Sequence, residues 1–556
     1  MPAIAFAFRP RLWTSLKAYR REDLPADVGA GVTVALVALP LAMAFAIASG
    51  VRPEQGIVTA IVGGVLVSLF GGSKVQIAGP AGAFVAMLYA IAAKYGVANL
   101  LIATMMAGAI LFALGALRLG TLVRFIPVSI VTGFTAGIAI IIALSQVKDF
   151  LGLAVGKMPA NFFSQLSVLA GSVTSTNLTT LAIGLSCVLV IVLWPARPGE
   201  KPGNWRWITA KLPSTVVVLV FSAFTVWALD LKVETLGTRF GSLPRGIPMP
   251  HAPDFDWATA QNLLAPAIAI ALLGAIESLL CARVADGMIG DRHDPNQELM
   301  AQGMANFLSP LFGGIAVTGT IARTMTNVRS GARSPVAGLV HSATLLLVMV
   351  AFAPAAGYIP LSALAAVLLW VAFNMVAWRE LRDLRKFSVF YRSILIATLT
   401  LTVVFDLTVA VEVGLVLSSL FFIYRISSLT TVRPIALPPR YAARAAPLVG
   451  IWELFGSIFF GSVTKLEALL DPAKPLPDVV VLDMGKVINC DTTGLDALEA
   501  LHGALGRRGG RLVLAEPNEQ PASLLARSGF DAILGRENIF PSLEAALDDI
   551  FKEPRA

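Results

Sequence analysis

The stretch QIAGPAGAF, residues 76–84, interrupts one of the most apolar parts of the chain. Runs typical of membrane helices flank it on both sides, at 58–70 and 85–93. Its glycines and proline break the helix where unpaired backbone amides are most costly, because lipid offers them no hydrogen-bond partner. Such a break is tolerated only where protein buries it or where it lines a cavity, so the stretch marks a candidate site.

The bulk composition is that of a polytopic membrane protein. The 556 residues are 56% hydrophobic and only 14% charged, whereas soluble domains carry roughly 25% charged residues. The net charge is +8, and the basic residues that produce it lie between apolar blocks, as residues flanking membrane helices do. This placement argues against nucleic acid as a partner. The three cysteines and four histidines are scattered, so we expect no metal site and no cofactor.

We predict fourteen transmembrane segments, of which the third and the tenth are unusually short. They lie near 28–47, 57–70, 81–93, 98–117, 127–147, 179–195, 213–230, 262–284, 299–312, 320–329, 336–354, 361–378, 392–405 and 408–426. Loops after even-numbered segments carry about twice as many Lys and Arg residues as the others, so the positive-inside rule places both termini in the cytoplasm. The basic segment 1–27 lacks the apolar core of a cleaved signal peptide. We therefore expect a multi-pass protein of the inner (cytoplasmic) membrane.

The two short segments occupy matching places, third of the first seven and third of the second seven. Paired broken segments of this kind indicate an inverted-repeat transporter whose binding site lies between the breaks. Because seven is odd, the second half must run with the opposite topology. We predict repeats at about 28–230 and 262–427 within a transmembrane domain spanning 28–427.

A small α/β domain follows the membrane part. Residues 428–446 are rich in Pro and Arg and are interpreted as a linker, and residues 447–556 as the domain. Strand-like runs stand at 448–460, 478–485 and 511–516, and helix-like runs at 493–509 and 521–529.

The broken segments carry the predicted chemistry. Pro80 begins a helix well, so the N–H groups of residues 81–84 are expected to point into the first break. In the second, residues 318–320 precede a short helix that begins near Ile321 and contains Arg323. Each helix N-terminus carries roughly +0.5 charge, so two together form an anion site. The alternative is that the glycines only let helices pack closely; their matching positions favour the anion site.

Glu277 lies about midway along an apolar span, where a carboxylate is a functional candidate by default. We expect it to gain and lose a proton during transport, and we place Thr318 with it as a candidate for the coupling-ion site. The alternative is a structural ion pair with Arg283 or Arg323.

Asp491, Thr492 and Thr493 lie between a predicted strand and a predicted helix. Asp or Thr at this position is a good helix N-cap. The functional alternative is a regulatory site, either for phosphorylation or for contact with a cytoplasmic partner.

At these residues the sequence resembles a known family. RREDLPADVGAGVTVALVALPLAMAFAIASG (20–50), GPAGAF (79–84) and IARTMTNVRSGARSPVAG (321–338) are similar to signatures of the SulP (sulfate permease) anion transporters. VVVLDMGKVINCDTTGLDAL (479–498) resembles their STAS domain. The resemblance implies two inverted seven-segment repeats forming core and gate domains, an elevator-like movement and a homodimer. It also implies a coupling carboxylate at Glu277 and an anion site at Ala81, Gly82, Ala83, Phe84, Gly319, Thr320, Ile321, Ala322 and Arg323.

Within the family, residues 126–153 and 272–288 look closest to the bacterial C4-dicarboxylate branch. Leu41 stands where many sulfate members carry Gln, which removes a polar group expected near the anion and disfavours sulfate. Ala81 stands where sodium-coupled bicarbonate members have a hydroxyl, and Glu277 replaces their Asp. Thr493 replaces the Ser that soluble STAS relatives phosphorylate, which puts kinase control in doubt.

The resulting hypothesis is secondary, proton-coupled uptake of C4-dicarboxylates such as succinate, fumarate and aspartate, with the proton preferred over sodium. Two alternatives stay open: a sulfate or bicarbonate transporter, and a membrane scaffold that senses anions and signals through the STAS domain. An enzyme is not expected, since no catalytic constellation or nucleotide-binding G-x-x-x-x-G-K-[ST] motif occurs in the sequence.

Overall fold

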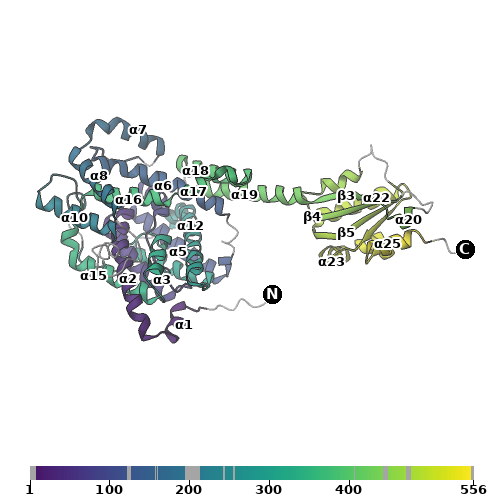
Figure 1. Cartoon of the computed structure of the whole chain (residues 1–556), viewed down its shortest axis with the longest axis horizontal. Coiled ribbons are helices and arrows are strands. Elements are labelled where there is room, and N and C mark those ends of the chain that lie inside the picture. The colour runs from purple at the N-terminus through teal and green to yellow at the C-terminus, as the bar shows by residue number, and fades with distance from the viewer. Residues whose placement is uncertain are drawn as a thin grey trace. The chain divides into compact units, whose positions relative to one another are not determined.

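The computed structural model describes residues 8–121, 127–156, 158–159, 161–194, 213–241, 244–253, 257–405, 407–442, 449–470 and 477–552. The chain forms two compact units, Met1–Leu415 and Val416–Ala556. Figure 1 gives the labels of their helices and strands.

The first unit is almost entirely helical (Figure 1). Its longer described helices are α2 (Leu24–Ala48), α3 (Pro53–Phe70), α4 (Val85–Tyr95), α5 (Val97–Ala116), α6 (Val128–Leu151), α7 (Phe162–Ser172), α8 (Leu178–Leu193), α10 (Ser214–Ala228), α12 (Trp257–Ile289), α13 (Pro295–Leu308), α14 (Ile321–Arg329), α15 (Val336–Ala356), α16 (Leu361–Met375), α18 (Val389–Val404) and α19 (Leu407–Leu429). Short helices α1 (Arg11–Lys17), α11 (Leu236–Phe240) and α17 (Trp378–Arg382) join them. The last long helix, α19, continues into the second unit.

Each of the fourteen predicted segments coincides with one of these helices, to within a few residues at the ends. Six described helices are long and apolar enough to cross a membrane on their own, and five more apolar helices are shorter. Helices short of a full span occur where neighbouring protein buries them. The structure adds α7, which the apolar pattern did not predict, and it meets α8 at a bend of 113°.

Small residues let the helices of the first unit approach closely. Helix α5 packs along α13, and Gly108 faces Gly303 across the contact. A Cβ atom added to Gly108 would lie 2.7 Å from the carbonyl oxygen of Gly303 and 2.5 Å from the amide nitrogen of Phe307. In a membrane, where apolar burial alone does not drive helices together, such close packing is a main source of their association.

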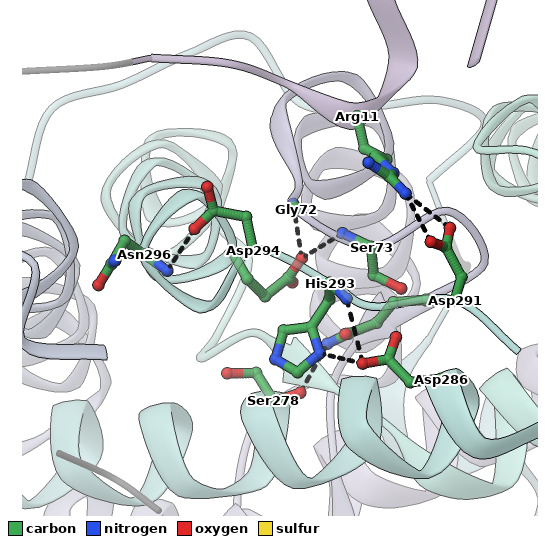
Figure 2. A network of polar contacts seen from close by, with 11 residues as sticks. Arg11, Gly72, Ser73, Ser278, Asp286, Asp291, His293, Asp294 and Asn296 are labelled. Carbon is green, nitrogen blue, oxygen red and sulfur yellow. Dashed lines mark hydrogen bonds and ion pairs between the residues drawn. The ribbon is translucent and has the colours of Figure 1, made fainter. Parts of the chain in front are cut away.

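A polar network ties the loops at one end of the first unit to the segment before α2 (Figure 2). Arg11 donates two hydrogen bonds to the Asp291 carboxylate, at 2.7 and 2.8 Å, and Lys74 lies 2.8 Å from the same group. Partial burial raises the pKa of Asp291, but the hydrogen bonds from Lys74 and Arg11 outweigh it and hold this pKa well below its usual range. The carboxylate therefore stays ionised, and the tie holds, as the pH falls through mildly acidic values.

The second unit is an α/β domain with a five-stranded sheet in the order β3-β4-β5-β6-β7. Strand β3 (Thr431–Ile435) runs antiparallel to β4 (Val449–Ile458), while β5 (Val479–Cys490), β6 (Arg511–Ala515) and β7 (Ile539–Phe540) continue in parallel. Two apolar clusters form its core, one containing residues of α22 (Thr492–Gly506), α23 (Glu519–Ser528) and α24 (Phe530–Leu534), the other residues of α25 (Leu543–Ile550).

One prediction in this region needs correction. Residues 428–446 were expected to be a linker, yet they contain the last two residues of α19, the strand β3 and the short helix α20 (Pro439–Ala442). Pro434 did not prevent strand formation, because β3 is at the edge of the sheet, where a residue without an N–H is tolerated.

Replacing Gly108 by Ala is expected to destabilise the first unit by about 1–3 kcal/mol, the usual cost of overpacking. The control is Gly287→Ala in α12, where an added Cβ meets nothing within 4 Å. Thermal unfolding of the detergent-solubilised protein measures both. A Gly108 variant that unfolds at the same temperature as the Gly287 variant would contradict the close α5–α13 contact.

Candidate functional site

The two broken segments meet inside the first unit. Strand β1 (Ala78–Gly79) pairs antiparallel with β2 (Thr318–Gly319), with Ala78 opposite Gly319 and Gly79 opposite Thr318. All four residues are buried. The ladder supplies partners for backbone groups that leave the helical pattern, which resolves the cost of breaking a helix at membrane depth.

A short helix leaves each end of the ladder. The first begins with η2 (Gly82–Phe84) and continues as α4, and the second is α14. Since the strands are antiparallel, the N-termini of both helices lie beside the same ladder. The amides of Gly82, Ala83, Ile321 and Ala322 have no recorded hydrogen-bond partner among the described residues. These groups are the donors available to an anion.

Two residues of the predicted anion site use their N–H groups within the protein, so not all backbone amides of that site are free to bind an anion. The N–H of Phe84 donates to the carbonyl oxygen of Ala81 at 3.2 Å, as the start of a 3₁₀ turn requires. The N–H of Thr320 donates to the carbonyl oxygen of Ile77 at 3.1 Å, extending the ladder by one bond. The side chains also differ in exposure: Ala81–Phe84, Gly319 and Thr320 are buried, while Ile321 and Ala322 are exposed.

Arg323 connects the two helix starts. Its Nη2 donates to the carbonyl oxygen of Pro80 at 2.8 Å, and its side chain is fully buried with 1% of the residue exposed. Its Nη1 has no hydrogen-bond partner among the described residues and lies against Gly79, where any Cβ atom would collide with it. A buried guanidinium with an unused donor, beside two helix N-termini, adds a full positive charge to the site.

Glu277 lies in α12, and Thr318, in β2, contacts the same helix. The Thr318 hydroxyl donates to the carbonyl oxygen of Gly274 at 3.2 Å, one helical turn before Glu277. The Glu277 Oε2 atom is buried and has no hydrogen-bond partner among the described residues. None of the ion pairs recorded in the described part of the chain joins Glu277 to Arg283 or Arg323. The Glu277 carboxylate therefore lies one helical turn from a contact with the ladder, and its Oε2 atom has no fixed partner in the described part of the chain.

Several polar residues that sequence reasoning missed hold the ladder in place. Gln76 donates to the carbonyl oxygen of Ser278 at 3.2 Å, and Thr324 accepts from the N–H of Ile77 at 3.0 Å. Asn327 donates to the carbonyl oxygen of Val75, and Asn306 bonds both backbone groups of Val317. The sequence did offer a signal for the amide side chains among them, because Asn and Gln beside a broken membrane helix usually hydrogen-bond its unpaired backbone groups.

Apolar side chains cover the first helix start. A Cβ atom at Gly82 would lie 3.2 Å from Phe45 and 3.3 Å from the sulfur of Met375. Phe45 comes from α2 and Met375 from the end of α16. No sequence motif pointed to either residue, because only the fold brings them to Gly82.

In the second unit, Asp491 is the N-cap of α22. Its carboxylate accepts from the N–H of Gly494 at 2.9 Å, so the capping interpretation of this residue is confirmed. Thr492 is exposed and Thr493 is half-buried. Cys490, just before them, is buried, and burial raises the pKa of its thiol to about 12, so it stays protonated.

Among the described residues, no group of three or more His, Cys, Asp and Glu side chains is positioned to hold a metal ion. The donors at the ladder are instead backbone amides and a guanidinium, which suit an anion.

Comparison with known proteins identifies the fold. Residues 24–398 match the Sulfate permease family, and residues 440–546 match the STAS domain. The chain belongs to the sulfate permease family. It has the helical transmembrane fold of that family followed by a STAS domain, and members of this family are transporters rather than enzymes.

Individual relatives extend over most of this sulfate permease. It is 40% identical over 529 residues to YvdB of Bacillus subtilis (strain 168), which bears a provisional name as a sulfate transporter; the match covers 94% of this chain and 97% of YvdB. It is 31% identical to the bicarbonate transporter BicA of Picosynechococcus sp. (strain ATCC 27264 / PCC 7002 / PR-6), over 86% of each chain.

Solved structures agree on the fold. The chain superposes on SLC26A9 with a TM-score of 0.83 at 18% identity, covering 96% of this chain and 91% of the other. The transmembrane domain of a cyanobacterial BicA superposes with a TM-score of 0.63 at 31% identity, over 71% of this permease and 98% of that chain.

These comparisons confirm the predicted family and revise the predicted branch. The relatives named above bear sulfate and bicarbonate names, and nothing in them supports the assignment to a C4-dicarboxylate branch. The local similarity in 126–153 and 272–288 therefore did not identify the substrate.

Replacing Gly79 by Ala is expected to displace the Arg323 guanidinium, because the new methyl group would collide with Nη1. One charge-assisted hydrogen bond is worth about 1.5–3 kcal/mol, so the apparent affinity for sulfate or bicarbonate should fall by roughly tenfold or more. Thermal stabilisation of the purified protein by added anion measures this. Gly29→Ala, which meets nothing within 4 Å, is the control, and an unchanged response in Gly79→Ala would contradict the assignment.

Proposed function

We propose that this sulfate permease is a secondary transporter of a small oxyanion, sulfate or bicarbonate. The observation that carries the proposal is the buried ladder with two helix N-termini and the Arg323 guanidinium beside it. Backbone amides aimed at one point bind an anion without regard to side-chain matching. The names of the relatives support these two anions over C4-dicarboxylates.

The proposed anion-binding residues are those at the two helix starts, with separate roles. The amides of Gly82, Ala83, Ile321 and Ala322 donate hydrogen bonds, and Arg323 supplies charge. Ala81, Phe84, Gly319 and Thr320 hold the backbone in position. Phe45 and Met375 limit the size of the ligand, because they lie against Gly82.

We further propose an elevator-like movement of the helices that carry the ladder, within a homodimer in the inner membrane, with both termini in the cytoplasm. The positive-inside pattern of the loops supports this orientation, and the inverted repeat supports alternating access.

Glu277 is the proposed carrier of a coupling proton, with Thr318 beside it. Moving one charge across 100 mV is worth about 2.3 kcal/mol, so entry of a dianion against an inside-negative potential costs about twice that. One proton bound at Glu277 offsets half of this cost. Sodium coupling is less well supported, since the side chain at residue 81 offers no hydroxyl to a sodium ion.

In the second unit, Thr492 and Thr493 are proposed as a contact site for a cytoplasmic partner of the STAS domain. The exposure of Thr492 supports this, while the cap made by Asp491 serves the helix itself.

Uptake into proteoliposomes of the purified protein tests the substrate. Labelled sulfate and bicarbonate should accumulate, and each should compete with the other, because one set of amides binds both. Succinate and fumarate, tested as competitors, should be weak, since Phe45 and Met375 crowd the site. Strong inhibition by succinate with no sulfate or bicarbonate flux would return the substrate to the dicarboxylates. Binding of anions with no flux at all would favour the sensing scaffold.

Replacing Glu277 by Gln is expected to abolish the response of sulfate uptake to an imposed pH gradient, because the amide cannot carry a proton. Accumulation driven by the gradient should fall to the level seen without one. Glu412→Gln, an exposed glutamate in α19, is the matched control. Uptake in Glu277→Gln that is still driven by the pH gradient would contradict a coupling role for Glu277. A response to a sodium gradient instead of a pH gradient would identify sodium as the coupling ion.

A further inference from the structure

A cavity of about 640 Å³ runs along α4 inside the first unit. It begins at Val85 and Ala86, in the first turn of α4, and reaches Lys94 at the other end of that helix. Helices α2, α6, α7, α12 and α18 contribute its other walls. Val85 follows Phe84 directly in the chain, so the cavity lining reaches the first turn of the helix whose N-terminus belongs to the proposed anion site.

The far end of the cavity carries four charged side chains: Lys94, Lys148, Asp149 and Arg239. Their formal sum is +2. Arg239 lies 3.0 Å from the Asp149 carboxylate and 2.9 Å from that of Glu234, which stands outside the lining. The Arg239 guanidinium therefore pairs with two carboxylates, and it neutralises the negative charge of Asp149 in the cavity lining.

The two lysines keep their charge available. Lys148 donates to the neutral carbonyl oxygen of Gly156 at 2.8 Å, and no other hydrogen bond of its ammonium group is recorded among the described residues. Lys94 is exposed and lies 4.9 Å from the centre of the Tyr95 ring. No carboxylate partner of Lys94 is recorded among the described residues.

Each lysine also has a simpler explanation. Both stand in the last turn of a helix, Lys94 in α4 and Lys148 in α6, where a cation stabilises the negative end of the helix dipole. That explanation accounts for their position in the chain. It does not account for both side chains lining one cavity that leads to the start of α4.

We propose that this cavity is an accessory anion site, an antechamber in which Lys94 and Lys148 collect the small oxyanion before it reaches the helix N-termini. The inference rests on the proposed function. Helix α4 has 11 residues, so the lysine end lies roughly 15 Å from the proposed site. Positive charge in a cleft with low-dielectric walls raises the local anion concentration over such a distance.

The test is sulfate uptake by the double variant Lys94→Gln/Lys148→Gln, at substrate concentrations below KM. At low ionic strength the rate should fall by about threefold to tenfold, because electrostatic steering is lost. At roughly 0.5 M salt, where charges act over only a few ångströms, it should approach the wild-type rate. The maximal rate at saturating sulfate should change little, since neither lysine contacts the proposed binding groups.

Three controls separate the explanations. The variant Lys94→Arg/Lys148→Arg keeps the charge and should keep the wild-type salt dependence. Lys232→Gln removes an exposed lysine that does not line the cavity and should leave KM unchanged. The single variants Lys94→Gln and Lys148→Gln should each show part of the loss.

A double variant with wild-type KM and wild-type salt dependence would overturn the antechamber, whatever its thermal stability. The same holds if the two lysines matter only for stability, so that the maximal rate falls and the salt dependence stays. Failure of the proposed function looks different: wild-type protein would then carry no sulfate or bicarbonate under any condition.

Discussion

The fold depends on a short β-ladder, in which two extended residues of one broken helix pair with two extended residues of the other. In lipid every N–H and C=O needs an internal partner, so two interrupted helices can coexist at membrane depth only if their extended residues satisfy each other. The β1–β2 ladder does this with Ala78, Gly79, Thr318 and Gly319. It also fixes the geometry of the proposed site, because an antiparallel ladder places two helix N-termini beside it.

The side chains around the ladder follow from that constraint. Gly79 leaves room for the Arg323 guanidinium, and Gly319 leaves room for the Gln76 amide. Arg323 is buried and bonded to Pro80, so it braces the first helix start while it contributes charge. A Lys at this position would lack the second donor group on the same planar head, which is why the two cations are not interchangeable here. Structural support and the proposed attraction of the anion therefore rest on one residue.

Much of this fold could be predicted from the sequence, because long apolar runs indicate membrane helices and glycine and proline within such runs indicate broken ones. The fourteen segments and the meeting of 76–84 with 318–323 followed from those signals. Helix α7 and the edge strand β3 did not. Ser164, Gln165 and Ser167 interrupt the apolar pattern of α7, and Pro434 in β3 is typical of a linker. The positions of Phe45 and Met375 at Gly82, and of Lys94 (α4) and Lys148 (α6) at one cavity, depend on which helices become neighbours. Periodicity in one segment carries no information about that.

The substrate was the least predictable feature, and the donor set explains why. Backbone amides are the same in every sequence, so a site built from them records charge but hardly any chemical identity. Under the proposed function, selectivity comes from the side chains that shape the space, here Phe45 and Met375, and from the proposed coupling ion. Tertiary packing places these side chains, and the proposed proton coupling depends on whether Glu277 is neutral or ionised when the anion binds. Local similarity to one branch of a family samples neither of these, so residues 126–153 and 272–288 can resemble dicarboxylate transporters in a chain whose proposed substrate is an inorganic oxyanion.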